Sequence, residues 1–387
     1  MLNKLYDKAI ILTQDYFPSV GGITTWCYQV ARSLESKGMN VLVITKAYDG
    51  YPHTGEFTKD ERGIKVLRLN HKNWKNYRNE RVYKAIKPLI TPNTVFVCAS
   101  WKMGVPCMLA SLKYDIDYIV AVHGLDAMES RMINKYLQKS TLRRSKGIIA
   151  VSSYTAEVLK ESFPGKLPFT VVINNGVDLN RFNITGRIDE IERKYSLSGG
   201  VRIISLGRLI PRKGFDTTIM AMSRLRELDA HLYIAGTGHY EERLRELVAE
   251  SNLENRVHFL GYIPDEDIAG LYNTCDIYSM PCRRLKGDVE GFGITYIEAA
   301  ACGLPSIGGR NSGAEDAIIH NETGILAEEG SVAEVVSAIK YLAENNDIRK
   351  LMGLNARKRA EEYFNWDYVG GKILDFINTA CNREPQP

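Results

Sequence analysis

A basic loop lies between an expected strand at 201–206 and an expected helix at 215–228. Its sequence is Gly207-Arg208-Leu209-Ile210-Pro211-Arg212-Lys213-Gly214. A guanidinium group and an ammonium group at the carboxyl end of a strand could grip a diphosphate together, which makes Arg208 and Lys213 candidate ligands. No G-x-x-x-x-G-K-[ST] pattern occurs, so the loop is not of the Walker A type. The alternative is a basic loop that binds nothing.

A second candidate is the segment Asp288-Val-Glu-Gly-Phe-Gly-Ile-Thr-Tyr-Ile-Glu298, in which an amphipathic helix is expected to begin near Ile294. The first amides of a helix have no intrahelical partner and favour an anion. On an ideal helix, eight positions correspond to a rotation of about 80° and a rise of about 12 Å. Glu290 and Glu298 therefore cannot form a close acid/base pair, but they suit two hydroxyl-bearing parts of one long ligand. The alternative is two solvated glutamates.

The N-terminal half offers weaker candidates. Gly21-Gly22 opens an expected helix and would let a ligand approach the backbone, although a plain turn explains the pair equally well. His123 follows an expected strand at 117–122, and ligands of open α/β sheets bind at the carboxyl ends of strands. The alternative for His123 is a structural histidine with satisfied hydrogen bonds.

Two D-x-D triplets, Asp115-Ile-Asp117 and Asp265-Glu-Asp267, resemble metal sites. Helix caps and solvated faces explain both, so we expect no metal and no other cofactor. No G-x-S-x-G nucleophile elbow occurs, which disfavours a hydrolase. No G-x-G-x-x-G follows the first strand, which disfavours a dinucleotide oxidoreductase.

The elements that must position these residues alternate between short β-branched runs and helical patterns, which indicates parallel α/β sheets. We expect a first domain over residues 1–183, a polar linker over 184–200 that ends in Gly-Gly, and a second domain over 201–366. Both are expected to be doubly wound. A final helix is expected over 367–381.

Composition and charge narrow the class of protein. The chain has 387 residues, of which 44% are hydrophobic and 25% are charged, as in soluble globular proteins. It shows no apolar run long enough to span a membrane and no secretory signal, and its seven cysteines contain no C-x-x-C pair. These features predict a cytoplasmic protein in a reducing compartment.

The net charge of +4 is unevenly distributed. Residues 1–183 contain 26 Lys and Arg residues against 15 Asp and Glu residues, whereas the remainder contains 24 against 31. The excess gathers in residues 65–87 and 131–146, where apolar and aromatic residues alternate with the bases. Such helices suit an anionic membrane surface, and ordinary solvated faces are the alternative. The modest pI argues against nucleic acid as a partner.

Taken in this order and spacing, the motifs make the chain resemble the retaining glycosyltransferases of family 4. The resemblance extends over most of the chain. It rests on Gly21-Gly22, Val122-His123-Gly124, Asn175-Gly176-Val177-Asp178, Gly207-Arg208 with Lys213-Gly214, Gly236-x-Gly238, and the pair Glu290/Glu298. It implies the GT-B fold, in which two Rossmann-like doubly wound domains face each other across a deep cleft. It also implies that helix 367–381 packs back on the N-terminal domain.

The resemblance also implies roles for particular residues. Arg208 and Lys213 would hold the donor diphosphate, Glu290 the hydroxyls of the transferred sugar, and Glu298 the ribose. Gly291, Phe292 and Gly293 would support the sugar and the phosphate, and His123 would contact the sugar. Gly21 and Gly22 would line the diphosphate and acceptor side. Gly261, Tyr262 and Ile263 would bind the base of the nucleotide. Among these, His123, Arg208, Lys213 and Glu290 are the expected catalytic residues.

The expected activity is metal-independent transfer of a hexosyl group, with retention, from a nucleotide sugar to a hydroxyl. The segment 282–291 looks most like bacterial phosphatidylinositol-type mannosyltransferases, which favours GDP-mannose. UDP-glucose, UDP-galactose and UDP-N-acetylglucosamine stay open as donors. The expected acceptor is a glycan, a lipid-linked glycan or a phospholipid on the inner face of the cytoplasmic membrane, in the synthesis of an envelope polysaccharide or glycolipid. The alternatives are a non-hydrolysing epimerase and a non-catalytic nucleotide-sugar scaffold.

Overall fold

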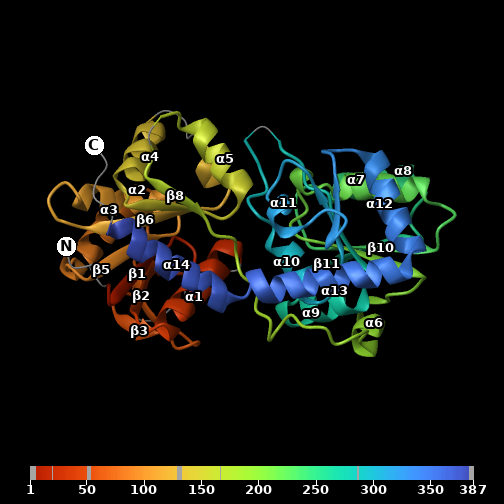
Figure 1. Cartoon of the computed structure of the whole chain (residues 1–387), viewed down its shortest axis with the longest axis horizontal. Helices are drawn as coiled ribbons and strands as arrows, with labels where there is room; N and C mark the ends of the chain where they lie inside the picture. The colour runs from red at the N-terminus through yellow and green to blue at the C-terminus, as the bar shows by residue number, and fades with distance from the viewer. Residues whose placement is uncertain are drawn as a thin grey trace. The chain divides into compact units, whose positions relative to one another are not determined.

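The computed structural model of the chain describes residues 6–19, 21–49, 54–128, 133–165, 167–285 and 287–382. They form two compact units. Unit 1 comprises Met1–Asn175 and Trp366–Pro387, and unit 2 comprises Gly176–Asn365. Each unit contains one sheet with packed helices, which confirms the predicted pair of Rossmann-like domains (Figure 1).

Unit 1 contains an eight-stranded sheet in the order β3-β4-β2-β1-β5-β6-β7-β8. All neighbours are parallel except the pair β3 and β4. The central strands are continuous apolar runs because both faces of a parallel sheet are covered. The strands are β1 Lys8–Leu12, β2 Asn40–Lys46, β3 Phe57–Lys59, β4 Lys65–Leu69, β5 Thr94–Cys98, β6 Asp117–Val122, β7 Gly147–Ala150 and β8 Phe169–Val172.

The helices of unit 1 include the last helix of the chain. α14 packs against α1, and Ser33 Oγ of α1 donates to the carbonyl oxygen of Trp366 at 2.9 Å. This places α14 in the unit to which the sequence assigned it. The helices are α1 Gly22–Ser36, α2 Trp74–Ile86, η1 Lys87–Leu89, α3 Trp101–Ala110, η2 Leu125–Ala127, α4 Ile133–Arg144, α5 Ser153–Ser162 and α14 Trp366–Cys381.

Unit 2 contains a six-stranded, wholly parallel sheet in the order β11-β10-β9-β12-β13-β14. Its strands are β9 Val201–Leu206, β10 Ala230–Ala235, β11 Val257–Gly261, β12 Ile277–Met280, β13 Ser306–Gly309 and β14 Gly324–Ala327. Its helices are α6 Asp189–Tyr195, η3 Pro211–Lys213, α7 Phe215–Arg224, α8 Glu241–Glu250, α9 Asp265–Thr274, α10 Ile294–Ala301, α11 Ala314–Ala317, α12 Val332–Glu344 and α13 Asn346–Tyr363.

Both sheets have a point at which the strand order reverses. In unit 1, β1 lies between β2 and β5, and in unit 2, β9 lies between β10 and β12. In each unit, the next strands along the chain are added on one side of the first strand, and later strands are added on its other side. The carboxyl ends of β1 and β5, and of β9 and β12, are therefore the places where a doubly wound sheet binds its ligand.

The boundary between the units differs from the predicted one. Unit 2 begins at Gly176 rather than after residue 183. Here Val177 donates its backbone N–H to the carbonyl oxygen of Phe364 at 2.7 Å, so the outgoing and returning segments are bonded to each other. The sequence could not reveal this pairing, because the two residues are far apart along the chain.

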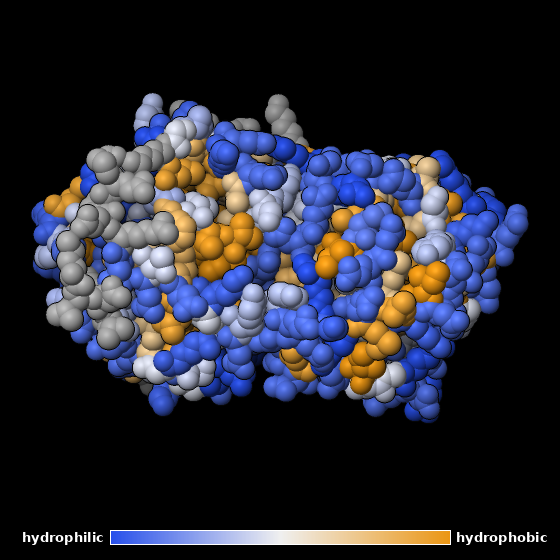
Figure 2. All heavy atoms as spheres, in the orientation of Figure 1, coloured by the Kyte–Doolittle hydropathy of each residue, from blue (hydrophilic) through white to orange (hydrophobic). Residues whose placement is uncertain are grey.

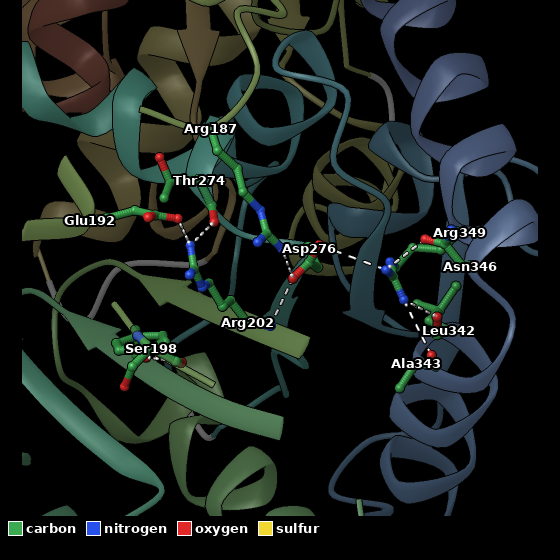
Figure 3. A network of polar contacts seen from close by, with 11 residues as sticks. Arg187, Glu192, Ser198, Arg202, Thr274, Asp276, Leu342, Ala343, Asn346 and Arg349 are labelled. Carbon is green, nitrogen blue, oxygen red and sulfur yellow. Dashed lines mark hydrogen bonds and ion pairs between the residues drawn. The ribbon is translucent and has the colours of Figure 1, made fainter. Parts of the chain in front are cut away.

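The predicted linker at 184–200 is a packed part of unit 2, and this prediction was wrong. It contains α6, whose Ile191 is buried and whose Glu192 pairs with Arg202 of β9 (Figure 3). Arg187 binds Asp276 with both N···O distances at 3.2 Å. Most of its polar residues are exposed, but Arg187 and Glu192 form ion pairs with the rest of the unit.

Hydrophilic residues predominate on the face drawn in Figure 2, and the hydrophobic ones lie in separate patches among them. In the part of the chain that the structure describes, no helix is long and apolar enough to cross a membrane. All seven cysteines are buried, and none of them forms a disulfide bond.

Candidate active site

The centre of the candidate site in unit 2 is the carboxylate of Glu290. Lys213 Nζ lies 2.7 Å from Glu290 Oε2, and Arg212 donates from Nη1 to the same oxygen. Arg212 Nε also lies 2.9 Å from Asp288 Oδ1. No hydrogen bond to Glu290 Oε1 occurs among the residues described, so this oxygen is available to a ligand hydroxyl.

The cluster is buried and charged. The exposed fraction of both Lys213 and Glu290 is 9%. Burial alone would raise the pKa of Glu290, but Lys213 and Arg212 outweigh it and hold that pKa below its usual value. Burial likewise opposes the charge of Arg212, yet Glu290 and Asp288 keep its pKa raised. Glu290 and Arg212 are therefore ionised at neutral pH. Two basic side chains, Arg212 and Lys213, thus surround the carboxylate of Glu290.

The local chain geometry brings these residues together. Lys213 closes η3 after β9, and Glu290 lies in the loop that follows β12, the neighbouring strand. Gly214 has φ 74°, and a Cβ there would collide with the carbonyl of Pro281. Only glycine permits this approach, which holds the basic loop against the end of β12.

The structure separates two residues that the sequence treated alike. Lys213 lies in the cluster, whereas Arg208 is exposed and has no ion pair in the described part of the chain. Arg212, which sequence reasoning did not select, takes the place beside Glu290. The sequence feature that could have identified Arg212 is its position next to Lys213. The side chains of adjacent residues normally point apart, however, and only the tight turn of η3 lets both reach one carboxylate.

The start of α10 adds a set of backbone donors beside Glu290. Gly293 caps the helix with φ 82°, and a Cβ there would lie 2.6 Å from the ring of Tyr296. The backbone N–H groups of Gly293, Ile294 and Thr295 have no acceptor among the described residues. These amides and the helix dipole favour an anion at this end. The side chain of Phe292 is in the core against Phe364, so this residue can offer a ligand only its backbone.

Glu298 lies on α10, apart from the Glu290 cluster. The Tyr272 hydroxyl donates to Glu298 Oε2 at 3.4 Å. Burial raises the pKa of Glu298 to about 7, and the more distant Arg181 only partly offsets it. A carboxyl group that is half-ionised at neutral pH differs sharply from the fully ionised Glu290.

The three residues expected to bind the nucleotide base lie at the end of β11 and directly after it. Gly261 ends β11 and accepts a hydrogen bond from the backbone of Gly236 at 2.7 Å. Tyr262 is 69% exposed, whereas Ile263 is buried. The ring of Tyr262 is thus open to a planar ligand group.

His123 and the glycine pair lie at the same end of the sheet of unit 1. The ring of His123 meets Trp26 of α1 edge-on, with centroids 5.1 Å apart. Gly21 and Gly22 begin that helix and are exposed. Burial lowers the pKa of His123 to about 4, so the imidazole is neutral. Its Nε2 is buried and has no hydrogen-bond partner among the residues described.

One carboxylate of each D-x-D triplet is bound to protein groups. Asp117 Oδ2 accepts from the hydroxyl of Tyr6 at 2.7 Å. Asp267 Oδ2 binds Lys194 at 2.6 Å and accepts from the Tyr195 hydroxyl at 2.5 Å. Within the described ranges, no group of three or more His, Cys, Asp or Glu side chains is arranged to hold a metal ion.

Comparison with known proteins matches both halves of the chain to glycosyltransferase families. Residues 20–181 match the model "Glycosyltransferase Family 4", and residues 187–359 match "Glycosyl transferases group 1". A GDP-mannose-dependent alpha-(1-6)-phosphatidylinositol monomannoside mannosyltransferase of Mycobacterium tuberculosis is 28% identical over 96% of this chain and 98% of the relative. Glycogen synthase of the same species is 23% identical over 98% and 96%.

A solved structure supports the fold. Sucrose-phosphate synthase from Thermosynechococcus elongatus superimposes with a TM-score of 0.80 over 96% of this chain and 98% of that chain, at 20% identity. At this level of identity the likeness concerns the fold alone. Both comparisons agree with the two parallel-sheet units described above.

Proposed function

Because the chain belongs to the GT-B glycosyltransferases of family 4, we propose that it transfers a hexosyl group from a nucleotide sugar to a hydroxyl, with retention and without a metal ion. The observation that supports this most is the cluster of Arg212, Lys213 and Glu290 at the reversal point of the unit 2 sheet. It combines cations for a diphosphate with a carboxylate for sugar hydroxyls.

The roles follow from the charge that develops during transfer. The anomeric carbon becomes cationic while the diphosphate leaves as an anion. Lys213, Arg212 and the free amides at the start of α10 would stabilise that anion as preorganised donors. Glu290 Oε1 would accept from hydroxyls of the transferred sugar. No side chain of the cluster is placed as a covalent nucleophile, so we assign deprotonation of the acceptor to the leaving phosphate.

We assign the remaining residues by the same reasoning. Glu298 would bind the ribose hydroxyls, Gly261, Tyr262 and Ile263 the base, and Gly291, Phe292 and Gly293 the sugar and phosphate through their backbone. Neutral His123, with its unpartnered Nε2, would contact the sugar, and the exposed Gly21-Gly22 would line the diphosphate and acceptor side. Arg208 would reach the diphosphate from its exposed position.

We propose mannose from GDP-mannose as the donor. The support is the length and extent of the similarity to the mannosyltransferase of M. tuberculosis. Glycogen synthase matches over as much of the chain, although at lower identity, so a UDP- or ADP-sugar is the competing donor. The acceptor would be a glycan, a lipid-linked glycan or a phospholipid, reached at the inner face of the cytoplasmic membrane. Basic residues of α2 and α4 would contact the anionic surface, although Arg131 lies outside the described residues.

The first test is a thermal shift panel of GDP-, UDP-, ADP- and dTDP-sugars with the free nucleotides alongside. A ligand at about 100 times its Kd should stabilise the protein by about 2.7 kcal/mol. We expect GDP and GDP-mannose to raise the Tm and the other nucleotides to raise it less. A shift only with a UDP- or ADP-sugar would replace the donor, and no shift with any nucleotide would contradict a transferase.

The pKa of Glu298 predicts how nucleotide binding depends on pH. Ribose hydroxyls donate to an ionised carboxylate, and with a pKa of about 7 only about a tenth of Glu298 is ionised at pH 6. The Kd of the preferred nucleoside diphosphate should therefore fall by up to roughly tenfold between pH 6 and pH 8. Isothermal titration at pH 6, 7 and 8 measures this change.

The Glu298→Gln variant is the control for this experiment. The terminal phosphate of the nucleotide also titrates near pH 6, and it does so identically with both proteins. The difference between wild type and variant therefore isolates the carboxyl group. The same pH dependence in both proteins would rule out a role for Glu298 in binding the ribose.

A further inference from the structure

Unit 1 contains a pocket of about 690 Å³, and all of its described lining residues belong to this unit. It opens at the carboxyl ends of β1, β2 and β4 and is walled by α2, α3 and α4. A smaller pocket of about 140 Å³ lies at the reversal point between β1 and β5 and shares Gln14 and Lys102 with it. The two pockets are therefore neighbours at the ligand-binding edge of the sheet.

The larger pocket, which we call the α2 pocket, is strongly basic. Lys46, Lys75, Arg78 and Lys102 line it, and Asp49 is its one carboxylate among the described lining residues. Asp49 is bound to His71 at 2.8 Å, and Lys46 is bound to Asp15 at 3.1 Å. The pocket therefore has a marked excess of positive charge.

Two of these cations, Lys75 and Arg78, have no carboxylate partner within the described ranges, whereas the charge of Lys102 acts on the buried carboxyl group of Asp126. Lys75 and Lys102 form no ion pair, and Arg78 donates from Nε only to the neutral side-chain oxygen of Asn79, at 3.2 Å. Burial lowers the pKa of Arg78, which shows that its charge is partly removed from water without a counter-ion. In unit 2 the half-buried arginines Arg212 and Arg283 bind carboxylates, so the α2 pocket lacks the partner that such a group normally has.

The floor of the α2 pocket is aromatic and contains an unused donor. Trp74 and Trp101 line it and are 8% and 4% exposed. The indole Nε1 of Trp74 is buried and has no acceptor in the described structure. A buried N–H without an acceptor costs free energy. Gln14, Asn79 and Asn134 add neutral groups that suit hydroxyls.

We propose that the α2 pocket binds a phosphate group of the acceptor, and that the acceptor is a phosphorylated sugar or polyol. Lys75, Arg78 and Lys102 would bind the phosphate, and the neutral side chains would bind its hydroxyls. The volume suits a ring with one phosphate. The smaller pocket at the reversal point would receive the part of the acceptor that carries the reacting hydroxyl. This inference rests on the proposed transferase function and narrows its acceptor to an anionic one.

Isothermal titration of the full chain with sn-glycerol 3-phosphate, myo-inositol 1-phosphate and neutral myo-inositol tests the proposal. We expect both phosphates to bind, and myo-inositol to bind at least about tenfold more weakly. The double variant Lys75→Ala/Arg78→Gln should weaken binding of the phosphates by at least about tenfold. Equal binding of myo-inositol, or no binding of either phosphate to the wild type, would overturn the proposal.

The matched control is Lys84→Ala/Lys87→Ala, which removes the same two positive charges from α2 and η1 outside the pocket. It should leave the affinity for the soluble phosphates unchanged. Equal weakening in both double variants would overturn the proposal in favour of general surface charge. Because Lys75 is exposed, Lys75→Ala alone serves if the double variant does not fold.

Flotation with phosphatidylcholine vesicles containing phosphatidylinositol distinguishes the two sources of phosphate. Flotation lost in Lys75→Ala/Arg78→Gln but retained in the control identifies a phospholipid head group. Binding of the soluble phosphates without flotation identifies a free phosphorylated acceptor. Flotation lost equally in both variants, without soluble binding, overturns the proposal. The nucleotide panel is also run on the two double variants. Donor binding should survive in both variants, so a failure of the pocket proposal can be told apart from a failure of the proposed transferase function.

Discussion

Replacing Glu290 by glutamine is expected to lower the kcat of sugar transfer by about two to three orders of magnitude. The substitution keeps the size of the side chain but removes the charge that holds Lys213 at 2.7 Å and Arg212 beside it. The two cations would then lose their common anchor, and the free Oε1 would lose the negative charge that strengthens its hydrogen bonds to sugar hydroxyls. Lys213→Ala should cause a loss of the same order, because it removes one donor to the leaving diphosphate.

Asp288→Asn is the matched control for Glu290→Gln. Asp288 also binds Arg212, at 2.9 Å, but its side chain is 36% exposed. We expect its loss to lower kcat less than tenfold. Initial rates of nucleoside diphosphate release with donor and acceptor measure both variants, and circular dichroism checks their folding. Turnover close to wild type in folded Glu290→Gln would contradict the proposed site.

Replacing Asp276 by alanine is expected to destabilise unit 2 by about 2–4 kcal/mol. Its carboxylate is 15% exposed and joins three segments that are distant in sequence, as Figure 3 shows. It binds Arg187 at 3.2 Å, accepts from the backbone N–H of Arg202 at 2.9 Å, and lies 3.7 Å from Arg349 of α13. Removing it would leave the two guanidinium groups without their shared anion, next to a backbone donor that has lost its acceptor.

For a unit of this size, that loss corresponds to a decrease in Tm of about 5–12 °C. Thermal and urea unfolding followed by circular dichroism measure it. The control is Glu246→Ala, which removes an exposed i,i+3 partner of Arg243 on α8 and should leave unfolding unchanged. Equal unfolding curves for the two variants would show that the Asp276 network does not stabilise the unit. Activity per folded molecule should be retained in Asp276→Ala, because the network does not contact the Glu290 cluster.

Much of the fold follows from local patterns. The central strands are apolar runs of four to seven residues that must be buried on both faces, so β1, β6, β9 and β12 can be located by inspection. The short antiparallel strand β3 and the late strand β14 do not stand out from their flanking residues as apolar runs, and the sequence did not predict them. Segment 184–200 was misassigned because charged residues that pair within a domain have the same composition as a solvated linker.

In the candidate site, too, some residues could be predicted from the local sequence and others could not. Glu290, Lys213 and the start of α10 were identified because residue type, glycine spacing and position after a strand all depend on neighbours in sequence. Arg212 was missed and Arg208 was placed with Lys213, because the direction of a side chain in a loop depends on how that loop packs. The turn of η3, held by Gly214 against Pro281, decides which basic residue meets the carboxylate.

The order of residues thus determines the class of fold, the strands and the chemical groups available, since these depend on local propensity and on the periodicity of burial. Contacts between distant segments decide what those groups do. The pairing of Val177 with Phe364 sets the boundary of the units, and Asp276 joins the segment before α6 to β9 and α13. The cations of the α2 pocket that form no ion pair come from two helices, α2 and α3. Ionisation follows from the same packing, because burial and neighbouring charge leave Glu290 charged and Glu298 half-protonated at neutral pH.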